Sequence, residues 1–210
     1  MNEAELSQSA RENLGTIRRL MERATVYRVI SAVPALTGGV LGVMVGLVLA
    51  FRSEPLTHRD FVLTWLAVYL VVDAINVFVL YREARNRGAA FPSSQLRYAV
   101  GALLPAMVTC GLIGVLFAWF REQPVSGVLM WAVGYGLGLL ATAAFAPRSI
   151  RVLGLSFLAA ALAAFGWLQF GATGDAESLK TASLLMAGTF GGFHVIYGVV
   201  VGWLSRDSAA

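Results

Sequence analysis

Two residues in otherwise apolar surroundings could exchange protons, Asp73 and His194. Tyr69 precedes Asp73 by four residues and Asn76 follows it by three, so a helix would place all three on one face. Tyr197 follows His194 by three residues in the same way. A carboxylate beside an imidazole can take up and release a proton near neutral pH, and such a pair can equally act as a structural hydrogen bond.

These residues lie inside apolar stretches that are each long enough to cross a bilayer. A helix rises about 1.5 Å per residue, so about 20 apolar residues span about 30 Å of hydrocarbon. Hydrophobic residues make up 58% of the 210-residue chain and charged residues only 13%, which excludes an ordinary soluble domain. The sequence predicts an all-α polytopic membrane protein, with an N-terminal amphipathic interfacial helix before six transmembrane helices. The predicted spans are 29–51, 61–80, 98–120, 126–147, 152–172 and 182–204.

The polar residues of the second and sixth predicted spans lie at matching depths in the membrane. Asp73 lies twelve residues from the start of the second span, and His194 lies twelve residues from the start of the sixth. Asn76 and Tyr197 are each three residues further along. If these two helices touch, they form a polar layer of Asp73–His194 above Asn76–Tyr197, with Tyr69 on the same face as Asp73. Such a layer would set helix register, bind a ligand, or form a proton-exchanging centre like those of proton-coupled transporters.

Basic residues alternate between the two sides of the predicted bundle. One side collects twelve Arg, and the other has three Arg and Lys180. The positive-inside rule then predicts that both termini face the cytoplasm. Fifteen Arg against one Lys is typical of a GC-rich bacterial genome. The expected organisation is a cytoplasmic amphipathic helix at 1–28, a transmembrane domain at 29–204 and a cytoplasmic tail at 205–210.

The N-terminal segment 1–28 has the pattern of an amphipathic helix. Its apolar residues recur at three- and four-residue steps: Leu6, Ala10, Leu14, Ile17, Met21 and Ala24. Basic residues on its other faces would draw it to anionic lipid headgroups, where it would anchor the bundle. The alternative is a docking helix for a cytoplasmic partner or a second subunit.

Small residues at four-residue spacing predict close helix contacts. The first span has Gly38, Gly42 and Gly46. The last span has three such pairs: Gly188 with Gly192, Ala187 with Gly191, and Gly198 with Gly202. Such stripes allow two backbones to approach closely. They would pack inside the bundle, or the glycines of the first span would form a seam in a homo-oligomer.

The connections between spans are short. The longest is predicted at 82–97, with Ser93 or Ser94 capping the third span. Asp175 and Glu177, after the fifth span, are interpreted as solvated charges.

No catalytic motif emerges. Rhomboid-type proteases need Gly-x-Ser-Gly, whereas residues 134–138 read Gly-Tyr-Gly-Leu-Gly, and aspartyl intramembrane proteases need a second membrane aspartate besides Asp73. There is no His-Glu-x-x-His for zinc. His58 lies outside the predicted spans, far from His194, so a bis-histidine haem does not fit within one chain. We predict no enzyme, catalytic residue or metal site. The cofactor stays open, including a haem with one histidine ligand or one shared between subunits.

Residues 20–27 (LMERATVY) and 191–198 (GGFHVIYG) resemble segments of an uncharacterised group of small bacterial six-span proteins. The resemblance covers the whole chain and implies the six-span fold and an inner-membrane location, with His194 and Tyr197 in the second motif. It implies no activity. The leading hypothesis is a non-enzymatic accessory or regulatory subunit of a membrane assembly. The alternative is a small proton-coupled transporter or channel that uses Asp73 and His194. Nucleic acid is not an expected partner, because the arginines lie at membrane borders.

Overall fold

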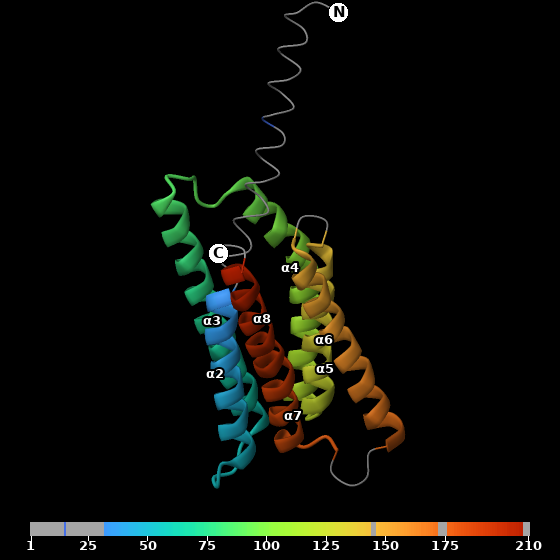
Figure 1. Cartoon of the computed structure of the whole chain (residues 1–210). Helices are drawn as coiled ribbons and strands as arrows, with labels where there is room; N and C mark the ends of the chain where they lie inside the picture. Colours follow the sequence, from blue (N-terminus) through green and yellow to red (C-terminus); the bar gives the residue numbers. More distant parts are fainter. Residues whose placement is uncertain (1–14, 16–31, 144–145, 172–175, 208–210) are drawn as a thin grey trace, which may run out of the picture.

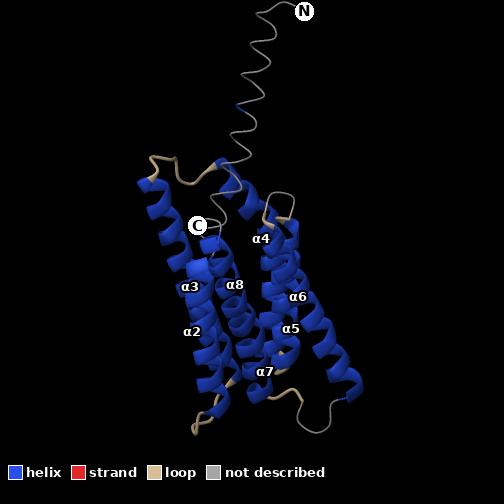
Figure 2. Ribbon diagram, in the orientation of Figure 1, coloured by secondary structure: helices blue, strands red, loops and turns tan. Residues whose placement is uncertain are grey.

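The protein is a bundle of long helices. The computed structural model describes residues 15, 32–143, 146–171 and 176–207, and every regular element in these ranges is helical (Figures 1 and 2). Within these described ranges, six helices are long and apolar enough to cross a membrane, which confirms the predicted all-α polytopic fold. The elements are α2 (Ala32–Phe51), α3 (His58–Asn86), α4 (Ser94–Val115), η1 (Leu116–Phe120), α5 (Pro124–Ala141), α6 (Arg148–Gly166), η2 (Trp167–Gly171), α7 (Leu179–Met186), η3 (Ala187–Phe193) and α8 (His194–Asp207). The three η elements are π-helical turns that continue the helices before them.

Some span boundaries differ from the sequence prediction. α3 has 29 residues and continues to Asn86, whereas its apolar stretch ends at residue 80. Its last turns are charged, and Arg87 pairs with Glu83 across one helical turn at 2.5 Å. Such pairs support a helix beyond its apolar part, so the predicted loop 82–97 is largely helical. The fourth span ends early, because α5 stops at Ala141 rather than at residue 147.

Side-chain caps set where several helices begin. The Thr57 hydroxyl accepts a hydrogen bond from the Asp60 backbone N–H at 3.0 Å, which starts α3. The Ser93 hydroxyl accepts from Leu96 at 3.1 Å, so the predicted capping of the third span by Ser93 is confirmed. Ser178 starts α7 in the same way. Each cap satisfies a backbone donor that has no partner within its own helix.

The spans form two groups of three. In the α2 group, α2 packs against the whole last span (α7, η3 and α8), and α3 packs against α2 and η1. In the α5 group, α5 lies between α4 and α6. The groups meet where α3 contacts η1 at the end of the α4 span, where α5 contacts α7, and where α6 contacts η3 and α8. Of the six spans, α5 is the most buried, whereas α3 and the α4 span are the least covered.

Glycines of the first span pack inside the bundle. A Cβ added at Gly42 would lie 3.1 Å from the Cα of Gly191, and one at Gly46 would lie 2.7 Å from the Cβ of Ala187. Gly38 faces the Val72 side chain of α3. These contacts support the interpretation as intramolecular packing and leave Gly42 and Gly46 unavailable for a seam between copies.

Of the small-residue pairs predicted in the last span, Gly188 with Gly192 does not pack against another helix. A Cβ added at Gly188 would meet nothing within 4 Å, and one at Gly192 would meet only the carbonyl of Ala187 in its own span. Gly191 and Gly198 face α2 instead. The π-helical turn η3 covers Ala187–Phe193, and its wider turn changes which residues share a face.

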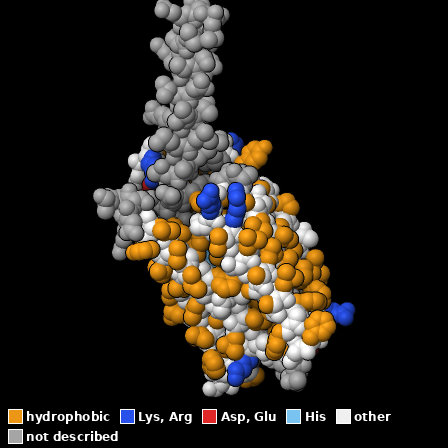
Figure 3. Space-filling view, turned by 45° about the vertical axis from the view of Figure 1, so that its right-hand side comes forward, with side chains coloured by type: hydrophobic (Ala, Val, Ile, Leu, Met, Phe, Trp, Pro, Cys, Tyr) orange, Lys and Arg blue, Asp and Glu red, His pale blue; other side chains and the backbone are white. Residues whose placement is uncertain are grey.

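The two ends of the bundle differ in charge. The N-terminal end of α2 and the C-terminal end of α8 lie toward the top in Figure 1. The connections from α3 to α4 and from α5 to α6 lie at the same end. We call this the basic end, and the arginine side chains that the structure describes there are Arg82, Arg85, Arg87, Arg97, Arg148 and Arg151. On the face in Figure 3, apolar side chains cover the body of the bundle and Lys and Arg lie toward its margins. This distribution is typical of a protein surrounded by lipid.

The predicted interfacial helix at 1–28 lies outside the described residues, apart from Gly15. At the other terminus α8 continues to Asp207, so the first three residues of the predicted tail 205–210 extend the last helix.

Candidate functional site

His194 lies where the two helix groups meet. Its Nε2 is 2.7 Å from the Tyr135 hydroxyl on α5, and its Nδ1 is 2.7 Å from the Phe190 carbonyl oxygen. A carbonyl oxygen only accepts, so Nδ1 carries the proton that is donated to Phe190. In the neutral ring Nε2 is then the acceptor, and Tyr135 donates to it. The bond from Tyr135 to His194 therefore joins α5 to the last span.

Aromatic rings enclose this pair. Phe157 of α6 has no exposed surface, and its ring centroid lies 4.8 Å from that of Tyr135 and 5.7 Å from that of His194. Phe190 stands 5.5 Å from Tyr135, and Phe193 stands 5.3 Å from Phe157. These rings pack around a part-buried hydrogen bond, and a hydrogen bond in such apolar surroundings is stronger than one in water.

A π-helical turn immediately precedes His194. The turn η3 has the sequence Ala-Gly-Thr-Phe-Gly-Gly-Phe and includes Phe190, whose carbonyl accepts from His194. Its Gly191 lies against the backbone of Val43 in α2. Turns of this kind are rare and are often found at functional sites. Here the turn positions the imidazole against α5 while glycine allows close contact with α2.

Asp73 does not pair with His194, so the predicted direct pair is wrong. Both ring nitrogens of His194 already have partners, and α3 packs against α2 and η1 rather than mainly against the last span. Tyr69 precedes Asp73 by one helical turn on the same face of α3. Both side chains are exposed, Tyr69 by 46%. Asp73 thus lies mid-span at the edge of the bundle.

The other predicted polar residues, Asn76 and Tyr197, differ in exposure. Tyr197 is buried, with 8% of its surface exposed, whereas Asn76 is exposed on α3. The second predicted tier, Asn76–Tyr197, is therefore divided between an exposed and a buried position.

Tyr135 is the site residue that the sequence analysis missed. It stands within the glycine-rich run 134–138 of the fourth span. It lies nine residues from the predicted start of its span, against twelve for His194. The length of a tyrosine side chain bridges that difference, so matched depth could have suggested the contact.

Glu177 has a structural role, which corrects its interpretation as a solvated charge. Its carboxylate accepts hydrogen bonds from the backbone N–H of Val125 at 2.8 Å, from that of Ser126 at 3.2 Å, and from the Ser126 hydroxyl at 2.5 Å. Pro124 occupies the first turn of α5. A carboxylate at a helix N-terminus satisfies free N–H groups and complements the helix dipole. Glu177 therefore ties the connection before α7 to α5; Asp175 lies outside the described residues.

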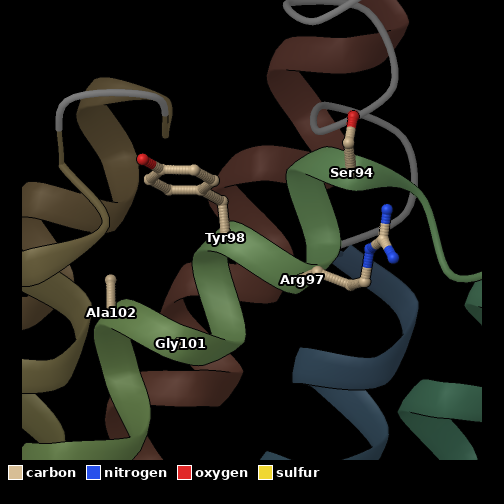
Figure 4. A pocket seen from close by; sticks show the side chains of 5 residues that line it. All are labelled: Ser94, Arg97, Tyr98, Gly101 and Ala102. Carbon is tan, nitrogen blue, oxygen red and sulfur yellow. The ribbon is translucent and has the colours of Figure 1, made fainter.

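A shallow depression of about 620 Å³ lies at the basic end, away from His194. Ser94, Arg97, Tyr98, Gly101 and Ala102 line it, all from the first turns of α4, and Arg97 and Tyr98 point apart (Figure 4). One buried donor in the described part of the chain, Trp65 Nε1, has no hydrogen-bond partner. Within those same residues no three His, Cys, Asp or Glu side chains gather as a metal site would require.

Comparison with known proteins adds no family to this picture. No family model, curated protein or solved structure matches the chain. Its function must be argued from the geometry above.

Proposed function

We propose that this chain is a non-enzymatic accessory or regulatory subunit of a larger membrane assembly. The observation that carries the proposal is the position of Asp73, which lies mid-span and exposed on a helix that its own bundle covers on one side. A charged side chain at the middle of a bilayer costs about 2.5–3.5 kcal/mol on insertion scales, so such residues normally face protein and have a partner. A second subunit would supply that protein surface.

The proposed location is a bacterial inner membrane, with both termini in the cytoplasm. The support is the distribution of basic residues: twelve lie on one side of the predicted bundle and four on the other. Alkaline phosphatase fused after residue 53 should be active, and the same enzyme fused at the C-terminus should be inactive. The opposite pattern would reverse the orientation.

Native mass spectrometry of the protein, extracted gently from its own membranes, tests the accessory function. We expect a second protein at constant stoichiometry with the chain. Spectra that contain only single copies or homo-oligomers with lipid would contradict the proposal.

A proton-coupled transporter or channel is the second candidate. It is favoured by the Tyr135–His194 hydrogen bond, which lies where the two helix groups meet, and by the mid-span carboxylate of Asp73. For this function, wild-type protein in liposomes should carry a proton flux, measured with an internal pH dye. The Asp73→Asn variant should abolish that flux without loss of thermal stability. An accessory subunit would show no flux in either form.

A further inference from the structure

α3 leaves one face of its membrane segment uncovered. Near the end opposite the basic end it is well packed, and Trp65 is only 4% exposed. Further along, Val72 packs against Gly38 of α2. The neighbouring Asp73 and Asn76 are exposed, although they lie mid-span and can reach neither the headgroups nor bulk water easily.

The exposed polar side chains form a stripe along one helix face: Tyr69, Asp73 and Asn76. Tyr69 lies one helical turn before Asp73, whose carboxylate has two oxygens and can accept several hydrogen bonds. Within the described residues no Lys or Arg pairs with Asp73, and the ion pair on this helix, Arg87 with Glu83, lies at the basic end. The stripe therefore combines an uncompensated negative charge with free acceptor capacity.

We propose that the Tyr69–Asp73–Asn76 stripe receives a transmembrane helix of a different protein, and that a Lys or Arg at mid-membrane on that helix pairs with Asp73. This inference rests on the accessory function proposed above and names the chemistry of the partner. A helix suits the site because α3 continues for 17 residues beyond Tyr69, which is about 26 Å at the helical rise. The backbone N–H and C=O groups of a partner helix are hydrogen-bonded within that helix, as the hydrocarbon requires.

Charge complementarity decides against a second copy of this chain. In the described spans every Lys and Arg lies near a helix end, so an identical subunit offers no cation at the depth of Asp73. Its His194 is held by Tyr135 and by the Phe190 carbonyl. A symmetric contact through the stripe would instead place two Asp73 carboxylates together, which is unfavourable.

Association with a model helix tests the charge pairing. The full chain, with Cys110→Ala and with an acceptor dye at Ser53→Cys in the exposed connection before α3, is placed in lipid nanodiscs. The probe is a donor-labelled polyleucine helix of about 21 residues with one central Lys, and the matched probes have Leu or Glu at the centre. Energy transfer should show the Lys helix binding about tenfold more tightly than the Leu helix, as one intramembrane polar contact allows.

Two variants make the result specific. Asp73→Asn should remove the advantage of the Lys helix, whereas Glu83→Gln, which removes a carboxylate from the same helix at its basic end, should keep it. Equal binding of the Lys and Leu helices, or of the Lys and Glu helices, would overturn the proposal. Energy transfer between differently labelled copies of the chain that Asp73→Asn abolishes would also overturn it, in favour of a homodimer.

Native mass spectrometry of Asp73→Asn separates this inference from the function on which it rests. A subunit that accompanies the wild type and is lost from Asp73→Asn supports both the accessory function and the stripe as its docking site. A subunit that accompanies the two forms equally keeps the accessory function and overturns the stripe as its docking site. If neither form has a subunit, the accessory function fails, and the model-helix measurement alone decides whether the stripe binds a cationic helix.

Discussion

The contact between α2 and the last span depends on Gly39, and a single methyl group there should weaken the bundle. A Cβ on Gly39 would lie 2.6 Å from the Val195 nitrogen, 2.9 Å from the Gly191 oxygen and 2.9 Å from the His194 carbonyl carbon. All three are backbone atoms, which cannot rotate away as a flexible side chain can. Ordinary contacts begin near 3.4 Å, so the two helices must separate locally by about 0.8 Å.

Gly39→Ala should therefore lower the free energy of unfolding by about 1–3 kcal/mol, the usual cost of overpacking. Gly42→Ala should cost less, because its added Cβ would lie 3.1 Å from the nearest atom. Gly188→Ala in the last span is the matched control, since its Cβ would meet nothing within 4 Å. The assay is equilibrium unfolding in mixed micelles with increasing denaturing detergent, followed by circular dichroism.

The expected loss of unfolding free energy is largest for Gly39→Ala, smaller for Gly42→Ala and absent for Gly188→Ala. The packing argument is refuted if Gly39→Ala unfolds within about 0.5 kcal/mol of wild type, the usual range of a neutral substitution. A loss in Gly188→Ala equal to that in Gly39→Ala would refute it as well.

Three further changes can be followed by the same unfolding measurement. Tyr135→Phe should cost about 1–3 kcal/mol, because it leaves Nε2 of His194 without a donor inside the protein, and Tyr81→Phe on the exposed side of α3 should change little. Glu177→Ala should cost about 0.5–2 kcal/mol by uncapping α5, whereas an unchanged stability would show that the cap is dispensable. Glu122→Gly should raise stability by about 1 kcal/mol, because this residue has a φ of 53°, where a side chain is unfavourable; a loss would mean that the Glu122 side chain matters more than its backbone.

The membrane fold could be predicted from sequence because it depends on distance along one axis. The number of spans follows from apolar length, and the depth of Asp73 and His194 follows from the helical rise. Helix ends were less predictable, because the charged turns of α3 continue a helix beyond the apolar stretch that hydropathy detects. The cap at Ser93 could be predicted because it is a local interaction.

The glycine contacts show how far four-residue spacing alone can predict which glycines pack against another helix. The stripe of Gly38, Gly42 and Gly46 lies in a regular helix, and all three glycines make close contacts. The last span contains three possible pairs, and η3 interrupts its regular repeat. Spacing alone could not show that Gly191 rather than Gly188 faces α2.

The partner of His194 was decided by tertiary structure. Matched depth makes both Asp73 and Tyr135 possible neighbours of His194, because a bundle of six helices brings several side chains to the same depth in the membrane. Which helix lies beside the last span, and how each helix is rotated about its axis, depends on packing among all six. In this protein α5 packs beside α7 while α3 lies against α2 and η1. The sequence by itself therefore determined the spans and the depth of their polar residues, whereas the lateral order and rotation of the helices determined that His194 bonds to Tyr135 and that Asp73 is exposed.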